Sequence, residues 1–320
     1  MRAEGYGTVS PVIRQQRTPT SGRVALVVAA VTLVLAGCGS SLPGTAAQVG
    51  ADRITVDSLQ SQVDDVLAYR SAQPGSTVRT QLPTITQQVL SGDVLHQLAQ
   101  TAVARTHLNV DEKAIADQIG SLDPKLLDNK GIEFITPATL PQFVHDQLVI
   151  SQLGARAWDG LAVTADLATA TDQADAEAKA KRMAQGPKES AAVVAEAMAH
   201  GQQARAGYAL SPATLEGLTS TPVFAVPAGS AVAFMLNKQW QVARIVTRTT
   251  TAPPNTSPDA VSAAQAQPGS TYALGIGLLD ELAGTPDVRV NPRYGSWDPT
   301  QGQVVVASAP PNAIVFNARP

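Results

Sequence analysis

A short apolar segment near the N-terminus indicates which part of this chain can belong to the folded protein. Residues 24–35 are almost all aliphatic, Arg23 precedes them, and no acidic residue lies between Arg23 and Cys38. This pattern is typical of a secretory signal. The run is too short to cross a bilayer as a helix, which needs about 20 residues. We therefore expect residues 1–37 to be an export signal and the folded protein to begin after them.

Cys38 is the only cysteine among the 320 residues. It ends the sequence Leu35-Ala-Gly-Cys38, which resembles a bacterial lipobox, where the cysteine thiol receives a diacylglycerol. The resemblance implies a lipoprotein on the outer face of the cell membrane, anchored to the membrane through the lipid on Cys38, with residues 38–44 as a tether. A lone cysteine can also be a core residue or a reactive thiol. In each case no second cysteine is present for a disulfide.

Composition excludes some classes of partner. Hydrophobic residues make up 44% of the chain, which is enough for a folded core, and charged residues only 15%, with a net charge of −3. A protein without an excess of basic residues has no electrostatic footprint for nucleic acid. The length left after the signal favours two compact units. We therefore expect a globular protein that does not bind nucleic acid.

The sequence contains few residues that could form a catalytic or metal-binding motif. The four histidines include no pair at helical i,i+4 spacing, so we expect no metal and no cofactor. Ser230 lacks the second glycine of a nucleophile elbow. Gly275-Ile-Gly277 has Asp280 where a dinucleotide loop needs its third glycine. We interpret neither motif as a site.

Periodicity organises the first half of the chain into two short strands and four helices. Thr55 is placed to cap the first helix and Thr139 the fourth. The strongest helix has apolar residues at helical spacing on a wide face. The expected strands are Ala46–Val49 and Arg53–Ile54, and the expected helices begin at Val56, run from about Thr84 to His107, cover Val110 to Ile119 and extend from Thr139 to Trp158.

Two motifs in this half resemble a known family. The strand-turn-strand sequence from Ala47 to Thr55 opens a helix, and the long helix leads into Asn109-Val-Asp-Glu-Lys113. Together with the lipobox, this order resembles the N-terminal chaperone domain of SurA-type and PrsA-type extracytoplasmic foldases, and it covers residues 45–160. An unrelated helical lipoprotein is the alternative.

In that family a parvulin-type prolyl isomerase domain usually follows, and residues 161–249 are similar to one in layout. We expect two helices, from Asp172 to Met183 and from Glu189 to His200. Val223-Phe-Ala-Val-Pro-Ala-Gly229 resembles the turn that parvulins place before their last strands. The expected closing strands lie at 206–210, 231–236 and 240–247.

The resemblance also implies a catalytic cluster, which this chain lacks. Parvulins carry a histidine on the first strand and another on the last, whereas residues 163–168 contain no histidine and Gln241 stands at the last-strand position. Leu215 and Leu218 align with the pocket-lining Met and Phe of the family. We therefore expect a degenerate parvulin-like domain without catalysis, in which Leu215, Leu218 and Phe224 are ordinary core residues.

The last part of the chain is expected to return to the first domain. Residues 250–270 are rich in Thr, Pro, Ser and Ala and predict a flexible linker, and residues 299–320 predict a flexible tail. Between them, residues 271–298 predict a helix at 271–283 and a strand at 287–290. The resemblance implies an α+β fold in which this helix and strand complete the SurA-type domain, so that the parvulin-like domain is an insertion. Leu274, Leu278 and Leu282 are then expected to pack against Val94 and Leu98.

The expected function is that of a chaperone-like lipoprotein that binds unfolded or exported polypeptides in an apolar groove, without catalysis. The alternatives are an active peptidyl-prolyl cis-trans isomerase with a divergent site, and a structural adaptor of the cell envelope. An apolar groove without specific polar or charged contacts discriminates little between client sequences. The candidate peptide-binding residues are Leu59, Val63, Val94, Leu98 and Phe143.

Overall fold

The computed structural model describes residues 43–73, 78–123, 127, 132–253, 255, 259–306 and 313–318. The predicted export signal, Cys38 and most of the predicted tether lie outside these residues. Residues 41–320 form one compact unit. Within the described ranges, no helix has both the length and the apolar character needed to span a membrane.

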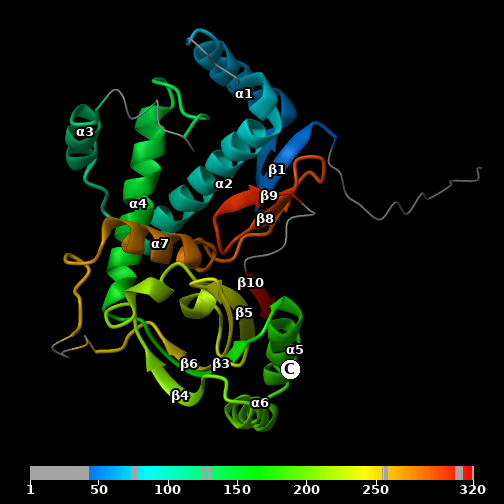
Figure 1. Cartoon of the computed structure of the whole chain (residues 1–320). Helices are drawn as coiled ribbons and strands as arrows, with labels where there is room; N and C mark the ends of the chain where they lie inside the picture. Colours follow the sequence, from blue (N-terminus) through cyan, green and yellow to red (C-terminus); the bar gives the residue numbers. More distant parts are fainter. Residues whose placement is uncertain are drawn as a thin grey trace, which may run out of the picture. The chain divides into compact units, whose positions relative to one another are not determined.

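A three-stranded antiparallel sheet joins the first two described strands to a strand more than 230 positions later (Figure 1). It consists of β1 (Thr45–Val49), β2 (Asp52–Thr55) and β7 (Val288–Val290), in the order β2-β1-β7. Ala47 of β1 lies opposite Val290 of β7. The predicted return of the C-terminal strand to the first domain is thus confirmed.

Four helices follow the first strands, and their starts test the two predicted caps. The helices are α1 (Val56–Ser71), α2 (Leu82–Thr106), α3 (Glu112–Gly120) and α4 (Leu140–Trp158). The Thr55 side chain accepts the N–H of Ser58 at 3.1 Å, which confirms that cap. The Thr139 cap is wrong, because the Thr139 hydroxyl instead accepts the N–H of Thr136, at 2.9 Å, in the preceding turn.

Helix α7 (Pro268–Leu282) is shared by two hydrophobic clusters. Ile276 and Leu279 belong to the cluster that contains Val94 and Leu98 of α2. We call this cluster, together with β1, β2, β7 and helices α1 to α4, the N-terminal domain. The predicted contact of α7 with α2 is therefore confirmed, but of its three predicted residues only Leu282 reaches that cluster. Leu274 and Leu278 face the other cluster, and Leu282 contacts both, because α7 is apolar on two sides.

A five-stranded antiparallel sheet forms the second region, which we call the middle domain. Its strands are β3 (Ala162–Ala170), β4 (Ala204–Leu210), β5 (Ala231–Leu236), β6 (Gln239–Thr249) and β10 (Ala313–Phe316), in the order β10-β5-β6-β3-β4. Helices α5 (Gln173–Met183) and α6 (Pro187–Ala199) pack on one face. The short turns η3 (Glu216–Leu218) and η4 (Pro222–Phe224) and one side of α7 pack on the other. The predicted α+β character of this region is confirmed.

The prediction of a flexible tail at residues 299–320 is wrong for its described part. Strand β9 (Gln303–Val305) pairs with β8 (Ser296–Asp298), and the N–H of Val304 donates to the buried Ser91 hydroxyl of α2 at 2.8 Å. Strand β10 then pairs with β5 of the middle domain, and Figure 1 shows it in dark red beside β5. Consecutive Val, Ile and Phe residues in these short strands supply apolar side chains that the overall composition of the segment does not reveal.

The predicted flexible linker at 250–270 is likewise packed where it is described. The indole N–H of Trp158 donates to the carbonyl of Val261 at 2.8 Å, and the N–H of Val261 donates to the carbonyl of Ala213 at 2.8 Å. Ala260, Ala263 and Ala266 lie against the hydrophobic cluster of the middle domain. Small apolar side chains allow this close packing despite a composition typical of loops.

Candidate functional site

The N-terminal domain contains a cavity of about 300 Å³, which we call the N-terminal cavity. Its walls come from α1, α2, α4, α7, residues 134–139 and residues 301–303. No Lys or Arg lines it among the described residues, while six amide side chains do. These amides belong to Gln62, Gln88, Gln142, Gln147, Gln301 and Gln303.

One wall of this cavity depends on Arg70, near the end of α1. The buried Arg70 guanidinium donates four hydrogen bonds of 2.6 to 3.1 Å to backbone carbonyls, and these bonds fix an irregular segment before α4. The segment positions Phe134, whose ring meets Phe143 of α4 edge to face at 5.9 Å. Nothing in the sequence distinguishes Arg70 from a surface arginine, so sequence reasoning missed it. The carbonyls belong to Leu127, Ile132, Glu133 and Ile135.

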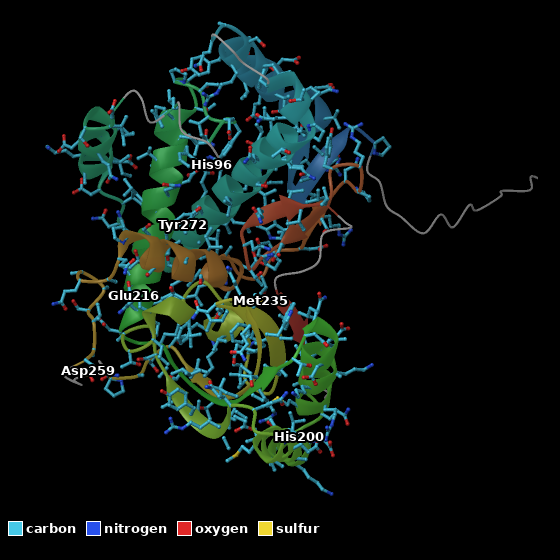
Figure 2. The ribbon with its side chains drawn as sticks, in the orientation of Figure 1. His96, His200, Glu216, Met235, Asp259 and Tyr272 are labelled. Carbon is cyan, nitrogen blue, oxygen red and sulfur yellow. The ribbon has the colours of Figure 1, made fainter. Side chains whose placement is uncertain are left out.

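Two carboxylates give the N-terminal cavity its electrostatic character. Nδ1 of His96 lies 2.9 Å from both carboxylate oxygens of Asp146, and this hydrogen bond raises the pKa of His96. Gln62 donates to Asp93 at 2.9 Å, while burial raises the pKa of the Asp93 carboxyl. Burial, and then the negative charge of Asp146, raise the pKa of the Tyr272 phenol. Figure 2 shows His96 on α2 and Tyr272 on α7, both in the N-terminal domain.

The predicted peptide-binding residues fall into two groups. Leu59, Val63, Val94 and Leu98 are buried in the hydrophobic cluster of the N-terminal domain, so their side chains do not face an open groove in the structure. Their wide apolar faces pack α1 and α2 against the sheet and α7. Phe143 is only partly buried and lines the N-terminal cavity. It is the one predicted residue that a bound polypeptide could contact.

A second cavity, of about 330 Å³, lies in the middle domain on the sheet face opposite α5 and α6. We call it the middle cavity. Leu215 and Leu218 line it and are only partly buried, so the prediction that they are ordinary core is wrong. Leu215 precedes η3 and Leu218 is its last residue, so this short turn holds both at the cavity wall. Phe224 is 1% exposed and is core, as predicted.

The middle cavity is poor in groups that transfer protons. Its polar side chains are those of Tyr208, Asn237 and Gln241, and no histidine, carboxylate, lysine or arginine lines it among the described residues. The Arg205 guanidinium stacks outside on the Tyr208 ring, 4.2 Å from its centroid. The cavity can therefore hold an apolar group and offer a few hydrogen bonds to it.

Metal-binding capacity is limited in the part of the chain that the structure describes. No group of three or more His, Cys, Asp or Glu side chains gathers there. His96 and Asp146 are engaged with each other, and His145 contacts the same carboxylate at 3.3 Å. Cys38 lies outside the described residues.

Comparisons with known proteins address the N-terminal domain. Residues 11–132 match the family model of the SurA-like N-terminal domain. Foldase protein PrsA from Lactococcus lactis, a crystal structure, is similar at 12% identity with a TM-score of 0.26, and the match covers 77% of this chain and 94% of that chain. No curated protein is significantly similar to the chain.

Proposed function

We infer that this chain, which carries a SurA-like N-terminal domain, is a lipid-anchored extracytoplasmic chaperone that binds unfolded or exported polypeptides without catalysis. The match over residues 11–132 supports a role in the chaperone and foldase class. The anchor rests on the lipobox-like sequence that ends in Cys38. A Cys38→Ser chain should lose lipid attachment, and its retention on membranes after an alkaline wash would contradict the anchor.

The lining of the N-terminal cavity carries the proposal for polypeptide binding. An extended chain presents N–H and C=O groups at nearly every residue, and a glutamine amide can both donate and accept. Gln62, Gln301 and Gln303 already make side-chain hydrogen bonds. The amides of Gln88, Gln142 and Gln147 are therefore the ones suited to backbone groups regardless of sequence. Phe134 and Phe143 supply an apolar wall beside them. Such a lining supports weak, sequence-tolerant binding.

The middle cavity supports binding more than catalysis. Rotation about a peptide bond has a barrier of about 18–20 kcal/mol, and the family resemblance implies a polar cluster with two histidines to lower the barrier of an X-Pro bond. Gln241 occupies the last-strand position, and residues 163–168 supply no histidine. We propose that this domain holds a client side chain without isomerising the chain.

Aggregation suppression tests the main proposal. The chain from Gly39 onward should keep a denatured, refolding client soluble, and Phe143→Ala should weaken this activity several-fold because it removes the apolar wall. Met198→Ala is the matched control, since Met198 is 60% exposed on α6, outside both cavities. Equal activity of the Phe143→Ala protein and the wild type would contradict the N-terminal cavity as the client site.

The apolar middle cavity also favours the second candidate, an active prolyl isomerase, because its volume of about 330 Å³ admits a proline side chain. A protease-coupled, proline-limited refolding assay separates the two functions. We expect no acceleration by the wild type. Acceleration that Gln241→Ala abolishes would instead establish the isomerase.

A further inference from the structure

The outer edge of the middle sheet is occupied by the chain's own end. Strand β10 pairs antiparallel with β5 over four residues, from Ala313 opposite Phe234 to Phe316 opposite Ala231. With β10 in place, the first four residues of β5 are buried. Without it, the backbone N–H and C=O groups along the outer side of β5 would have no strand partner.

The attachment of β10 is small compared with the edge that it covers. The strand has four residues, and Val315 is 40% exposed. Phe316 packs against the hydrophobic cluster under α5, and beyond it the N–H of Ala318 donates to Ser230 at 3.4 Å. β10 pairs with β5 over four residues, whereas β6 pairs with β5 over six, so β10 is the more weakly held neighbour of β5. It can therefore exchange with another strand at modest cost.

The sequence of β10 shows what this edge accepts. Ala-Ile-Val-Phe is uncharged and is dominated by β-branched and aromatic residues, which favour strands. The addition of an extended peptide to an exposed sheet edge draws its affinity from the main chain and its selectivity from alternate side chains. On β10, Phe316 packs against the cluster under α5, and Ile314 lies opposite Ala233, a residue of that cluster.

We propose that the outer edge of β5 is a strand-binding site for an extended, uncharged, apolar segment of a client polypeptide, and that β10 occupies it until a client strand replaces it. This inference rests on the proposed function, because it takes the partner to be a polypeptide. It adds a site separate from both cavities. The direction of binding is antiparallel to β5, as it is for β10.

The main test uses the full chain from Gly39 onward and a labelled peptide with the sequence of residues 311–318. In the double variant Ile314→Asp and Phe316→Asp, the charges disfavour β10 at the edge, so the peptide should bind at least tenfold more tightly than it binds the wild type. Val315→Asp is the matched control, because the exposed Val315 points away from the cluster, and it should behave like the wild type. Equal affinity for all three folded proteins would overturn the proposal.

A reversible lock keeps the proposal testable if the double variant fails to fold. Ala233 and Ile314 lie directly opposite each other, so the double variant Ala233→Cys and Ile314→Cys can be joined by a disulfide. In the oxidised form peptide binding should fall at least tenfold below that of the reduced form. Unchanged binding on oxidation, with the disulfide verified by mass, would place the peptide elsewhere.

A second peptide separates a client site from a fixed internal contact. It has the unrelated core Val-Thr-Ile-Tyr between the same ends, and it should bind the Ile314→Asp, Phe316→Asp protein within tenfold of the β10 peptide. If the β10 peptide bound and the unrelated peptide did not, the edge would be specific for β10 itself, and the proposed client site would be overturned. Aggregation suppression in the locked protein, measured in parallel, reports on the N-terminal cavity and so tests the proposed function independently.

Discussion

The two domains form their sheets from very different stretches of chain. The middle domain joins β3, β4, β5 and β6 from one continuous segment, and only its edge strand β10 comes from elsewhere. The N-terminal domain joins β1 and β2 to β7, and Asn291 next to β7 bonds to Thr45 across 246 positions. Regular strands hold the middle domain, whereas single anchoring side chains hold the irregular parts of the N-terminal domain. Substitutions should therefore affect the two domains unequally.

The largest effect is expected at Arg70. Arg70→Met keeps most of the side-chain volume but removes all four hydrogen bonds from the guanidinium to backbone carbonyls, and the free energy of unfolding should fall by roughly 3–5 kcal/mol. Urea denaturation measures this change. Arg156→Met is the control, because exposed Arg156 makes one bond to the carbonyl of Thr106 at 2.8 Å and should cost less than about 1 kcal/mol. An equal fall in the free energy of unfolding of the two variants would show that Arg70 does not anchor the irregular segment.

The next effect is expected where α7 crosses α4. A Cβ on Gly275 would lie 2.0 Å from the carbonyl oxygen of Ile150, so the helices touch backbone to backbone. Gly275→Ala should force them apart and lower the free energy of unfolding by roughly 3 kcal/mol. Gly277→Ala, whose Cβ would lie 3.8 Å from that of Ala225, is the matched control. Replacing glycine by alanine in a helix stabilises it by up to about 1 kcal/mol, so Gly277→Ala should not lower the Tm. A lower Tm for Gly277→Ala than for Gly275→Ala would disprove the close crossing.

A smaller effect is expected at the first helix cap. Thr55→Ala removes the acceptor for the N–H of Ser58 and should lower the free energy of unfolding by about 1 kcal/mol. Thr86→Ala is the control, since the Thr86 hydroxyl donates to the Leu82 carbonyl inside α2, a bond that adds little to a helix. The two variants should differ in urea midpoint, and coincident midpoints would contradict the cap.

The smallest effect concerns pH and the pair His96 and Asp146. Because the pKa of His96 is raised above 6.5 in the folded state, its contribution is fully present below pH 6.5 and is lost as pH rises through the raised pKa. Asp146→Asn should flatten the dependence of Tm on pH between 6 and 9. The free energy of unfolding should change by less than about 1 kcal/mol, because the pair is partly exposed. The same slope in both proteins would show that the pair does not titrate with folding.

Much of the fold could be predicted from the sequence, because it depends on periodic apolar residues. The Thr55 cap, the strand pairing of residues 288–290 with 47–49 and the strands of the middle domain follow from local patterns or from the family resemblance. The faces of α7 could not be predicted, because a helix apolar on two sides gives no sign of which side meets which cluster.

The candidate site was less predictable than the fold. Apolar periodicity marks Phe143, Leu59 and Leu98 alike, yet Leu59 and Leu98 are core and Phe143 lines the N-terminal cavity. The carbonyl partners of Arg70 lie in an irregular segment whose path no periodicity encodes. The strand at β10 was missed because four apolar residues in a Pro-rich end carry too little pattern.

The pairing of β1 with β7 also determines when the first sheet can form during synthesis of the chain. Thr45 leaves the ribosome 246 residues before Asn291, its hydrogen-bond partner. At about 5–20 residues per second, synthesis alone separates the two by roughly 12–50 s. The middle domain has its four continuous strands well before then, since β6 ends at Thr249. The first domain in sequence is therefore completed only after the continuous strands of the middle domain have been synthesised.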